Sequence, residues 1–386
     1  MKRILFVIPI FNHGGTNRSL LNIISCLNED EYSIDIYSLS HQGPYKQIFD
    51  SSRVLRRDIL LSSVFESYKY IQSQTWGEKL KKIMLKSVYR SLRIVFGEKV
   101  KQWVFAAAAQ KISRMNYDTV VAMQEGIVTH LVSRVKGYKV AWIHSDYDKY
   151  FAIVGQDEER IYAQFDQIIC VSEYTRRVFV ERYPALYNKC HAVHNMLHSE
   201  TIINMANDTN SIDVRFNPRQ FCIVSIGRLS PVKQFDIIPS LAAALRAAGC
   251  QFHWYIIGEG EEKAHIVKMI QKFQVSDIVI LLGQQNNPYP YIKASNLLVC
   301  TSASEACPLV INEARILHVP VVSTDFGSAP EFIEEGYNGR IASRENIQDA
   351  IKEMICNQAA YQKIKDNISS FTYSNRRIID DISGLI

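Results

Sequence analysis

The feature that most constrains this chain is a series of short apolar segments, rich in Ile and Val, separated by stretches with helical periodicity. In the first half they are Ile4–Ile8, Ser33–Ser38, Thr119–Met123, Lys139–Ile143 and Gln167–Val171, and in the second half Phe221–Ile226, Phe252–Ile257, Ile278–Leu282, Asn296–Cys300 and Val319–Ser323. Their apolar residues are consecutive rather than alternating, which predicts strands covered on both faces, as in parallel sheets flanked by helices. Because strand–helix alternation restarts after residue 220, we expect an α/β protein with two such sheets.

The length and composition fit two domains. A chain of 386 residues exceeds one ordinary core, and 47% hydrophobic with 22% charged residues is typical of a well-packed globular protein. We expect a first domain at 1–197, a polar, turn-rich linker at 198–220 and a second domain at 221–372. The final segment, 373–386, has the pattern of a capped amphipathic helix.

Charge, cysteines and hydropathy exclude several classes of protein. A net charge of +5 is mild for a general nucleic-acid binder, so we expect no nucleic-acid partner. The eight cysteines form no CxxC pair and several lie in apolar segments, which favours reduced thiols in a cytoplasmic protein. No stretch approaches 18 consecutive apolar residues, about the minimum for a membrane span. The apolar N-terminus continues into Asn12–Gly15 rather than into a signal-peptide cleavage site, so we expect a strand there.

Residues 79–101 form a separate basic segment. Its cations are interspersed with apolar residues, as in a basic amphipathic helix; they are Lys79, Lys81, Lys82, Lys86, Arg90, Arg93, Lys99 and Lys101. One interpretation is a solvated charged face on a helix that packs against the first sheet. The other is docking on an anionic membrane surface, where each cation contributes about 1 kcal/mol. The second interpretation predicts a peripheral protein on the inner face of the plasma membrane.

The segment after the strand 296–300 contains two glutamates. Glu305 falls in a short loop and Glu313 in the helix that follows, with Pro308 suited to the first turn of that helix. Eight helical positions span about 12 Å, the scale of a nucleotide diphosphate. The free N–H groups at a helix N-terminus favour phosphate. Two glutamates at this spacing are also common on ordinary surface helices, so the pair alone is a weak signal.

The strand 221–226 leads into a second candidate segment. Gly227 permits a tight turn at the end of this strand, and Arg228 and Lys233 supply cations that can bind phosphate. The carboxyl ends of parallel strands are where ligands bind in open α/β folds. Two surface cations in a loop would give the same pattern without a ligand.

Taken together, these motifs resemble a known family. GRLSPVKQFD, IIGEGEE, SEACPLVINEA and VPVVSTDFGSAPEFIEEGYNGRI, all within 216–345, are similar to the donor-binding half of retaining GT-B glycosyltransferases of family 4, the glycosyl transferases group 1. The spacing from Glu305 to Glu313 matches the signature of that family. In the first half the resemblance is limited to Gly14-Gly15, WIHSDY and CVSEYT. It implies two Rossmann-like domains whose parallel sheets face a central cleft, with the helix 373–386 crossing back to the first domain.

The resemblance also implies roles for residues of the donor site. Arg228 and Lys233 would neutralise the diphosphate, Glu305 would hold hydroxyls of the transferred sugar, and Glu313 would bind the ribose. The remaining donor contacts that it implies come from Gly14, Gly15, Gly227, Gln285, Ala306, Cys307, Pro308 and Leu309.

His144 follows an apolar strand, at a position where the family has a histidine beside the reacting sugar. Without the resemblance, a structural histidine that caps a strand would be the simpler interpretation. Residues that we expect on the acceptor side are Asn17, Asp146, Ser172 and Asn195, although Ser172 and Asn195 fit a helix cap and a turn equally well. Asp146 and Asp148 resemble the DxD metal motif of another glycosyltransferase fold, but Arg228 and Lys233 can supply the same charge. We therefore expect neither a metal nor another cofactor.

The resemblance implies a retaining glycosyltransferase that uses a nucleotide-diphosphate sugar, with UDP as the expected nucleotide. The expected acceptor is a hydroxyl of a saccharide or lipid-linked saccharide, in the synthesis of a bacterial surface polysaccharide. Two alternatives stay open: a sugar-nucleotide 2-epimerase, and a non-catalytic protein that binds nucleotide sugars.

Overall fold

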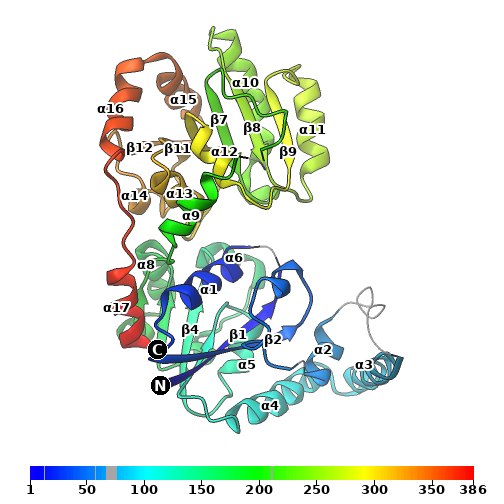
Figure 1. The fold of residues 1–386 in the computed structure, drawn as a ribbon. Helices are drawn as coiled ribbons and strands as arrows, with labels where there is room; N and C mark the ends of the chain where they lie inside the picture. Colours follow the sequence, from blue (N-terminus) through cyan, green and yellow to red (C-terminus); the bar gives the residue numbers. More distant parts are fainter. Residues whose placement is uncertain (13, 57, 67–75, 210–211) are drawn as a thin grey trace. The chain divides into compact units, whose positions relative to one another are not determined.

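The chain folds into two compact units. The structure, a computed structural model, describes residues 1–12, 14–56, 58–66, 76–209 and 212–386. The first unit contains residues 1–196 and 375–386, and the second contains residues 197–374 (Figure 1). The final helix, α17 (Arg376–Leu385), therefore packs with the N-terminal unit. Its end is held there, since Lys2 Nζ donates a 2.6 Å hydrogen bond to the carbonyl of Ile386.

The first unit is built on a parallel six-stranded sheet with the order β2-β1-β3-β4-β5-β6. The strands are β1 (Lys2–Ile10), β2 (Tyr32–Ser40), β3 (Thr119–Ala122), β4 (Tyr138–Ile143), β5 (Gln167–Cys170) and β6 (Cys190–Ala192). The helices between them are α1 (Gly15–Cys26), α2 (Ile59–Phe65), α3 (Trp76–Phe96), α4 (Lys99–Ser113), α5 (Ile127–Val132), α6 (Tyr147–Val154), α7 (Glu159–Tyr162) and α8 (Glu173–Arg182).

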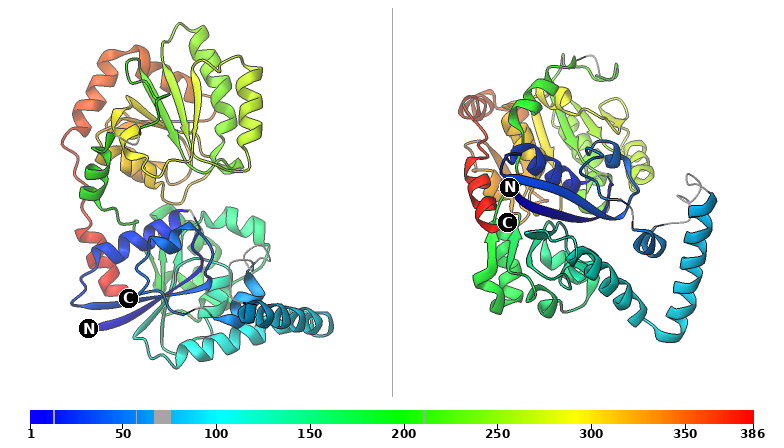
Figure 2. Two further views of the ribbon diagram at one scale, coloured as in Figure 1. Left: turned by 45° about the vertical axis from the view of Figure 1, so that its right-hand side comes forward. Right: turned by 60° about the horizontal axis from the view of Figure 1, so that its bottom comes forward.

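The second unit has its own parallel six-stranded sheet, with the order β12-β11-β10-β7-β8-β9 (Figure 2). The strands are β7 (Cys222–Ile226), β8 (His253–Ile257), β9 (Val279–Gly283), β10 (Leu297–Cys300), β11 (Val321–Thr324) and β12 (Gly339–Ala342). The helices are α9 (Ser199–Ala206), α10 (Ile238–Ala247), α11 (Lys263–Lys272), α12 (Tyr289–Ala294), α13 (Leu309–Ile316), α14 (Ala329–Phe332), α15 (Ile347–Cys356) and α16 (Gln358–Ile368).

Both faces of each sheet are buried, which explains the continuous apolar segments. Val224 packs on the side of α9, α12 and α13, while its neighbour Ile223 packs on the side of α10, α11 and α15. All ten segments that the sequence predicts as strands are strands of these two sheets. The edge strands β6 and β12 were not predicted, because β6 has only three residues and β12 begins with Gly339 and Arg340 instead of a continuous apolar segment.

The segment 198–220, expected to be a linker, instead contains helix α9. Ile202 and Ala206 of this helix are buried in the core of the second unit. Polar residues around the helix hide its single apolar face in the sequence. Residues 210–211 of the expected linker lie outside the described residues. Within the described ranges, no helix is long and apolar enough to cross a membrane.

Candidate functional site

The strand order of the second unit defines one point where its chain path changes direction. β7 and β10 are neighbours, and from them the chain continues to opposite edges of the sheet, through β8 and β9 on one side and β11 and β12 on the other. Ligands of open α/β folds bind outside the carboxyl ends of the strands at such a switch point. Gly227 follows β7 and Thr301 follows β10, so the two candidate loops of the sequence meet here.

The two loops are joined by an ion pair between Lys233 and Glu305. The Lys233 ammonium contacts Glu305 Oε1, although 72 residues separate them in sequence. Ser302 Oγ donates a 2.6 Å hydrogen bond to the same carboxylate oxygen. The structure therefore brings together two of the predicted site residues.

The backbone around this ion pair is fixed by further hydrogen bonds. Thr301 Oγ1 donates to the Lys233 carbonyl at 2.8 Å, and the Ala303 amide donates to the Val232 carbonyl at 2.8 Å. From the next loop, Ser328 Oγ donates to the Glu305 carbonyl at 2.8 Å. These contacts hold the loops after β7 and β10 as one rigid surface.

The Glu305 carboxylate stabilises the charged form of Lys233. Burial by itself lowers the pKa of Lys233, but the Glu305 carboxylate and the nearby Cys300 together raise it by more, so the net pKa lies above that of an ordinary lysine. Lys233 is therefore a cation at neutral pH. An ammonium group can donate to phosphate oxygens and a carboxylate can accept from hydroxyls, which are the two functions that a phosphorylated sugar requires.

The backbone of the IIGEGEE segment, which follows β8, packs directly against the backbone of the loop after β7. A Cβ on Gly258 would lie 1.8 Å from the Gly227 carbonyl oxygen, and one on Gly260 would lie 2.2 Å from the Leu229 carbonyl oxygen. The Leu229 amide donates to the Glu259 carbonyl at 3.0 Å. These two glycines are thus required for close approach of backbones.

Two donor-site predictions near β7 need correction or qualification. Gly227 was expected for its turn, but a Cβ there would meet only the side chains of Lys233 and Phe235 at ordinary contact distance, so its turn does not demand glycine. Arg228 is paired with Glu261 at 3.0 Å, and its side chain is 71% exposed. It lies on the same loop as Lys233, but an exposed ion pair of this kind holds a side chain only weakly.

The second glutamate lies inside helix α13. Glu313 is 1% exposed, which distinguishes it from an ordinary surface glutamate, because burying a carboxylate is costly unless polar groups compensate it. Pro308 was predicted in the first turn of this helix but is its N-cap, and the helix begins at Leu309. Ala306 is buried, whereas Cys307 and Leu309 are half-buried.

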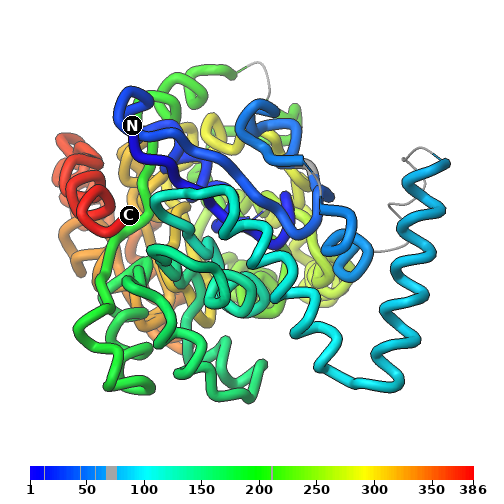
Figure 3. Tube along the Cα trace, turned by 90° about the horizontal axis from the view of Figure 1, so that it is seen from below, coloured from blue at the N-terminus to red at the C-terminus, as the bar shows by residue number. Residues whose placement is uncertain are grey.

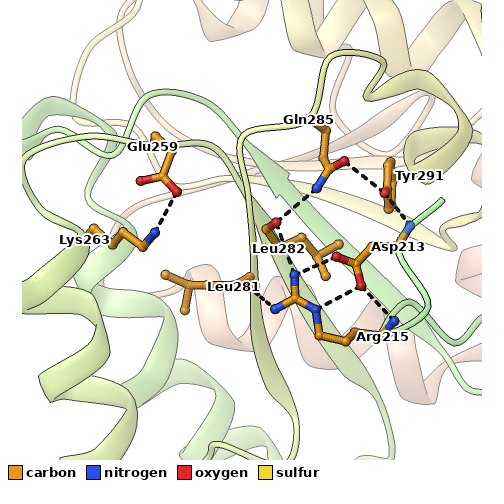
Figure 4. A network of polar contacts seen from close by, with 8 residues as sticks. All are labelled: Asp213, Arg215, Glu259, Lys263, Leu281, Leu282, Gln285 and Tyr291. Carbon is orange, nitrogen blue, oxygen red and sulfur yellow. Dashed lines mark hydrogen bonds and ion pairs between the residues drawn. The ribbon is translucent and has the colours of Figure 1, made fainter. Parts of the chain in front are cut away.

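Gln285 belongs to a polar network that fixes the end of β9 (Figure 4). Its amide donates to the Leu282 carbonyl at 3.0 Å and accepts a 3.2 Å hydrogen bond from the Tyr291 hydroxyl. Arg215 donates to the carbonyls of Leu281 and Leu282 and pairs with Asp213. The side chain of Gln285 is therefore committed to this network, and its predicted contact with a nucleotide remains a prediction.

In the first unit, the predicted Gly14 is the N-cap of α1 and the predicted Gly15 is the first residue of that helix. A Cβ on either glycine would meet nothing within 4 Å, so packing within this unit does not require them to be glycines. The buried Asn17 has an internal role, since its Nδ2 donates to the carbonyls of Ile10 and Asn12 at 2.9 and 2.7 Å.

His144 follows β4 and is held by a residue that the sequence analysis missed. The backbone amide of His144 donates to Glu125 Oε2 at 3.0 Å, and the Ser145 hydroxyl donates to Glu125 Oε1. Glu125 is 5% exposed and lies three residues after the end of β3, so a search for polar residues shortly after strand ends would also have found it. Burial raises the pKa of Glu125.

The ring of His144 stacks on Trp142 at 6.0 Å between centroids, and its Nε2 is buried without a hydrogen-bond partner in the described structure. Burial lowers the pKa of His144 to about 3. The ring is therefore neutral at physiological pH, and it can exchange a hydrogen bond with a hydroxyl but cannot act as a cation.

The other acceptor-side candidates have structural hydrogen bonds. Asp146 caps α6 and accepts from the Tyr174 hydroxyl at 3.2 Å, and Ser172 caps α8. Asn195 Oδ1 accepts a 2.6 Å hydrogen bond from Ser19. The structure favours a supporting role for these three residues, and contact with an acceptor remains a prediction.

Acidification is expected to destabilise the protein through His144. Its native pKa of about 3 lies below the unfolded value of about 6.5, so the unfolded chain takes up the proton first and stability is lost as the pH falls below 6.5. The loss at pH 5 is about 2 kcal/mol. Thermal unfolding of wild type and His144→Gln between neutral pH and pH 5 measures it. Equal pH slopes for the two proteins would contradict this assignment.

Known proteins resemble this chain over its whole length. The family model described as glycosyl transferases group 1 matches residues 207–370. An uncharacterized glycosyltransferase of Haemophilus influenzae is 22% identical over 398 residues, with 100% of both chains covered. The amylovoran biosynthesis glycosyltransferase AmsD of Erwinia amylovora is 20% identical over 97% of this chain and 94% of its own. The crystal structure of Anabaena HepE in complex with UDP and glucose has the same fold, with a TM-score of 0.75 at 16% identity over 100% of this chain and 99% of HepE.

Proposed function

We propose, from the premise that this chain is a GT-B protein whose second unit is a glycosyl transferases group 1 domain, that it transfers a sugar from a nucleotide-diphosphate sugar to a hydroxyl group. The observation that carries the proposal is the Lys233–Glu305 pair at the switch point between β7 and β10. It combines a cation for the diphosphate with a carboxylate for the sugar hydroxyls.

We assign the roles at this site as follows. Lys233, with Arg228 on the same loop, stabilises the negative charge that develops on the departing diphosphate, which is the largest catalytic contribution that such a site can make. Glu305 orients the sugar and Glu313 accepts hydrogen bonds from the ribose. The proton of the acceptor hydroxyl passes to the departing diphosphate as the new glycosidic bond forms and the bond to the diphosphate breaks. Retention of configuration rests on the family resemblance alone, and we propose that no metal is needed.

We further propose UDP as the nucleotide and a saccharide or lipid-linked saccharide of a bacterial surface polysaccharide as the acceptor. UDP and glucose in HepE support the first choice, and the role of AmsD in amylovoran biosynthesis supports the second. His144 would exchange a hydrogen bond with a hydroxyl of the reacting sugar through its neutral ring.

Incubation of the purified protein with UDP-, GDP-, ADP- and dTDP-sugars, with and without saccharide acceptors and with EDTA as a control, tests this function. We expect one donor class to be consumed, at a rate that EDTA leaves unchanged and that rises when an acceptor is present. An epimerised donor without an acceptor would identify a 2-epimerase. Nucleotide binding without turnover across the panel would identify a binding protein, and either result would refute the transferase.

A further inference from the structure

Helix α3 presents its apolar side chains to the outside of the molecule. A helix on the surface of a globular protein normally turns its apolar stripe toward the core. In α3 most of the large apolar residues are instead between 38% and 87% exposed; they are Trp76, Leu80, Ile83, Met84, Val88, Leu92, Ile94, Val95 and Phe96. Figure 3 shows α3 as the long helix that runs apart from the sheet of its unit.

The face that α3 turns toward its own unit is mixed, with Lys82 and Lys86 beside the half-buried Leu85 and Tyr89. Lys82 is the buried residue of this helix, at 2% exposure, and forms an ion pair with the buried Glu66. Lys86 Nζ donates to the Glu66 carbonyl at 2.8 Å. The helix packs against α2 and α4 through this face. The solvated face therefore carries apolar residues as well as cations, and Lys82 is not a surface cation.

The exposed residues are arranged as an apolar strip with a basic border. At about 100° per residue, the exposed apolar positions cover roughly half of the helix circumference. Lys79 and Arg90 lie along one border of this strip, and Lys81 lies within it, between Val88 and Leu92. The small Ser87 and Ser91 also lie within the strip. Exposed apolar patches with polar rims mark sites of association.

We propose that α3 is a docking surface for an anionic lipid bilayer, on which it lies with its apolar strip in the interface and its cations at the level of the headgroups. Residues 76–101 contain eight lysines and arginines but only two glutamates. A second copy of this chain would place like charges against each other, whereas anionic headgroups attract them. The combination of an apolar strip with basic flanks is the one that binds membrane interfaces.

A cavity beside the N-terminal half of α3 is lined by further cations. It has a volume of about 420 Å³, and its cationic lining side chains other than Lys82, which is paired with Glu66, are Lys46 and Arg56. Glu78 is the lining carboxylate. The positive charge next to the helix thus extends beyond α3 itself, which strengthens attraction to an anionic surface.

Docking through α3 does not depend on the transferase activity. The functional consequence of docking rests on the proposed function: if the protein transfers a sugar, docking would bring it to acceptors that carry a lipid. Vesicle binding without any donor, and transfer to a water-soluble saccharide without vesicles, are separate measurements. Failure of one therefore leaves the other standing.

The test is co-sedimentation with vesicles of phosphatidylglycerol and phosphatidylcholine, compared with vesicles of phosphatidylcholine alone. We expect wild type to bind the anionic vesicles, and binding to fall with salt. Ile94→Glu/Val95→Glu should bind at least about tenfold more weakly. The matched control is Ile153→Glu on α6, since Ile153 and Ile94 are 86% and 87% exposed, and it should bind like wild type. Lys79→Gln/Lys81→Gln should lose about fivefold for each cation.

Several outcomes would overturn the proposal. They are no binding by wild type, equal binding to neutral vesicles, and undiminished binding by Ile94→Glu/Val95→Glu. Concentration-dependent dimerisation that this double variant abolishes, without vesicle binding, would show that the strip covers a second copy instead. Because the substituted side chains are exposed, unchanged circular dichroism and melting temperature are expected and show that each variant is folded.

Discussion

Replacement of Lys233 by Met is expected to lower the rate of donor consumption about 100- to 1000-fold, the usual effect of removing one preorganised charge from a transition-state site. Methionine keeps most of the length and volume of the side chain but removes the ammonium group that contacts Glu305. The Glu305 carboxylate would keep its hydrogen bond from Ser302. The loss should therefore appear in catalysis more than in folding, and steady-state kinetics with melting curves separates the two.

The matched control for this prediction is Lys263→Met. Lys263 also pairs with a glutamate of the second unit, Glu259, at 2.7 Å, and Figure 4 shows this pair apart from the network around Gln285. Both side chains are nearly half exposed, and surface pairs of this kind contribute about 0–1 kcal/mol. Lys263→Met should keep the wild-type rate. Equal losses in the two variants would show that Lys233 has no special role.

Gly258→Ala is expected to have the largest effect on stability, on the order of 3 kcal/mol. Gly258 has φ +146°, a conformation that side chains rarely adopt, and a Cβ there would lie 1.8 Å from the Gly227 carbonyl oxygen. Neither backbone can move freely, because the Gly227 amide donates to the Ile257 carbonyl and the Gly258 amide donates to the Gly283 carbonyl. Urea unfolding measures the change.

Loss of donor consumption should accompany the loss of stability in Gly258→Ala, since the displaced Gly227 loop carries Lys233. Gly384→Ala provides the control, because a Cβ there meets nothing within 4 Å. That variant should unfold at the wild-type urea concentration. A Gly258→Ala protein with wild-type stability and activity would show that the loops after β7 and β8 do not depend on this close approach.

The fold could be predicted from the sequence to the extent that burial leaves a local pattern. A strand such as 221–226 has both faces covered, so all of its residues except Ser225 are apolar and it is visible without any knowledge of its neighbours. Helix α9 was missed because only Ile202 and Ala206 of its short span are buried. The edge strand β6 has only three residues, and β12 is interrupted by Gly339 and Arg340, so neither gives a continuous apolar segment.

The candidate site could be predicted only in part, for a related reason. Lys233 and Glu305 could each be predicted as site residues, because each follows the end of a predicted strand. Their ion pair depends on the pairing of β7 with β10, which no local sequence pattern specifies. Periodicity identified the basic helix but not which of its faces is outward, because that depends on Glu66 pairing with Lys82. The role of Glu125 likewise follows from the neighbouring positions of β3 and β4.

The central claim is that the Lys233–Glu305 pair forms the binding site of a nucleotide diphosphate. Calorimetric titration of UDP, GDP, ADP and dTDP into wild type, Lys233→Met and Lys263→Met tests it most directly. The account predicts that one nucleotide, UDP, binds wild type and Lys263→Met equally and binds Lys233→Met at least about tenfold more weakly, as expected for the loss of a charge-assisted contact to phosphate. Equal affinity of all three proteins for UDP, or no binding of any of the four nucleotides by wild type, would contradict it.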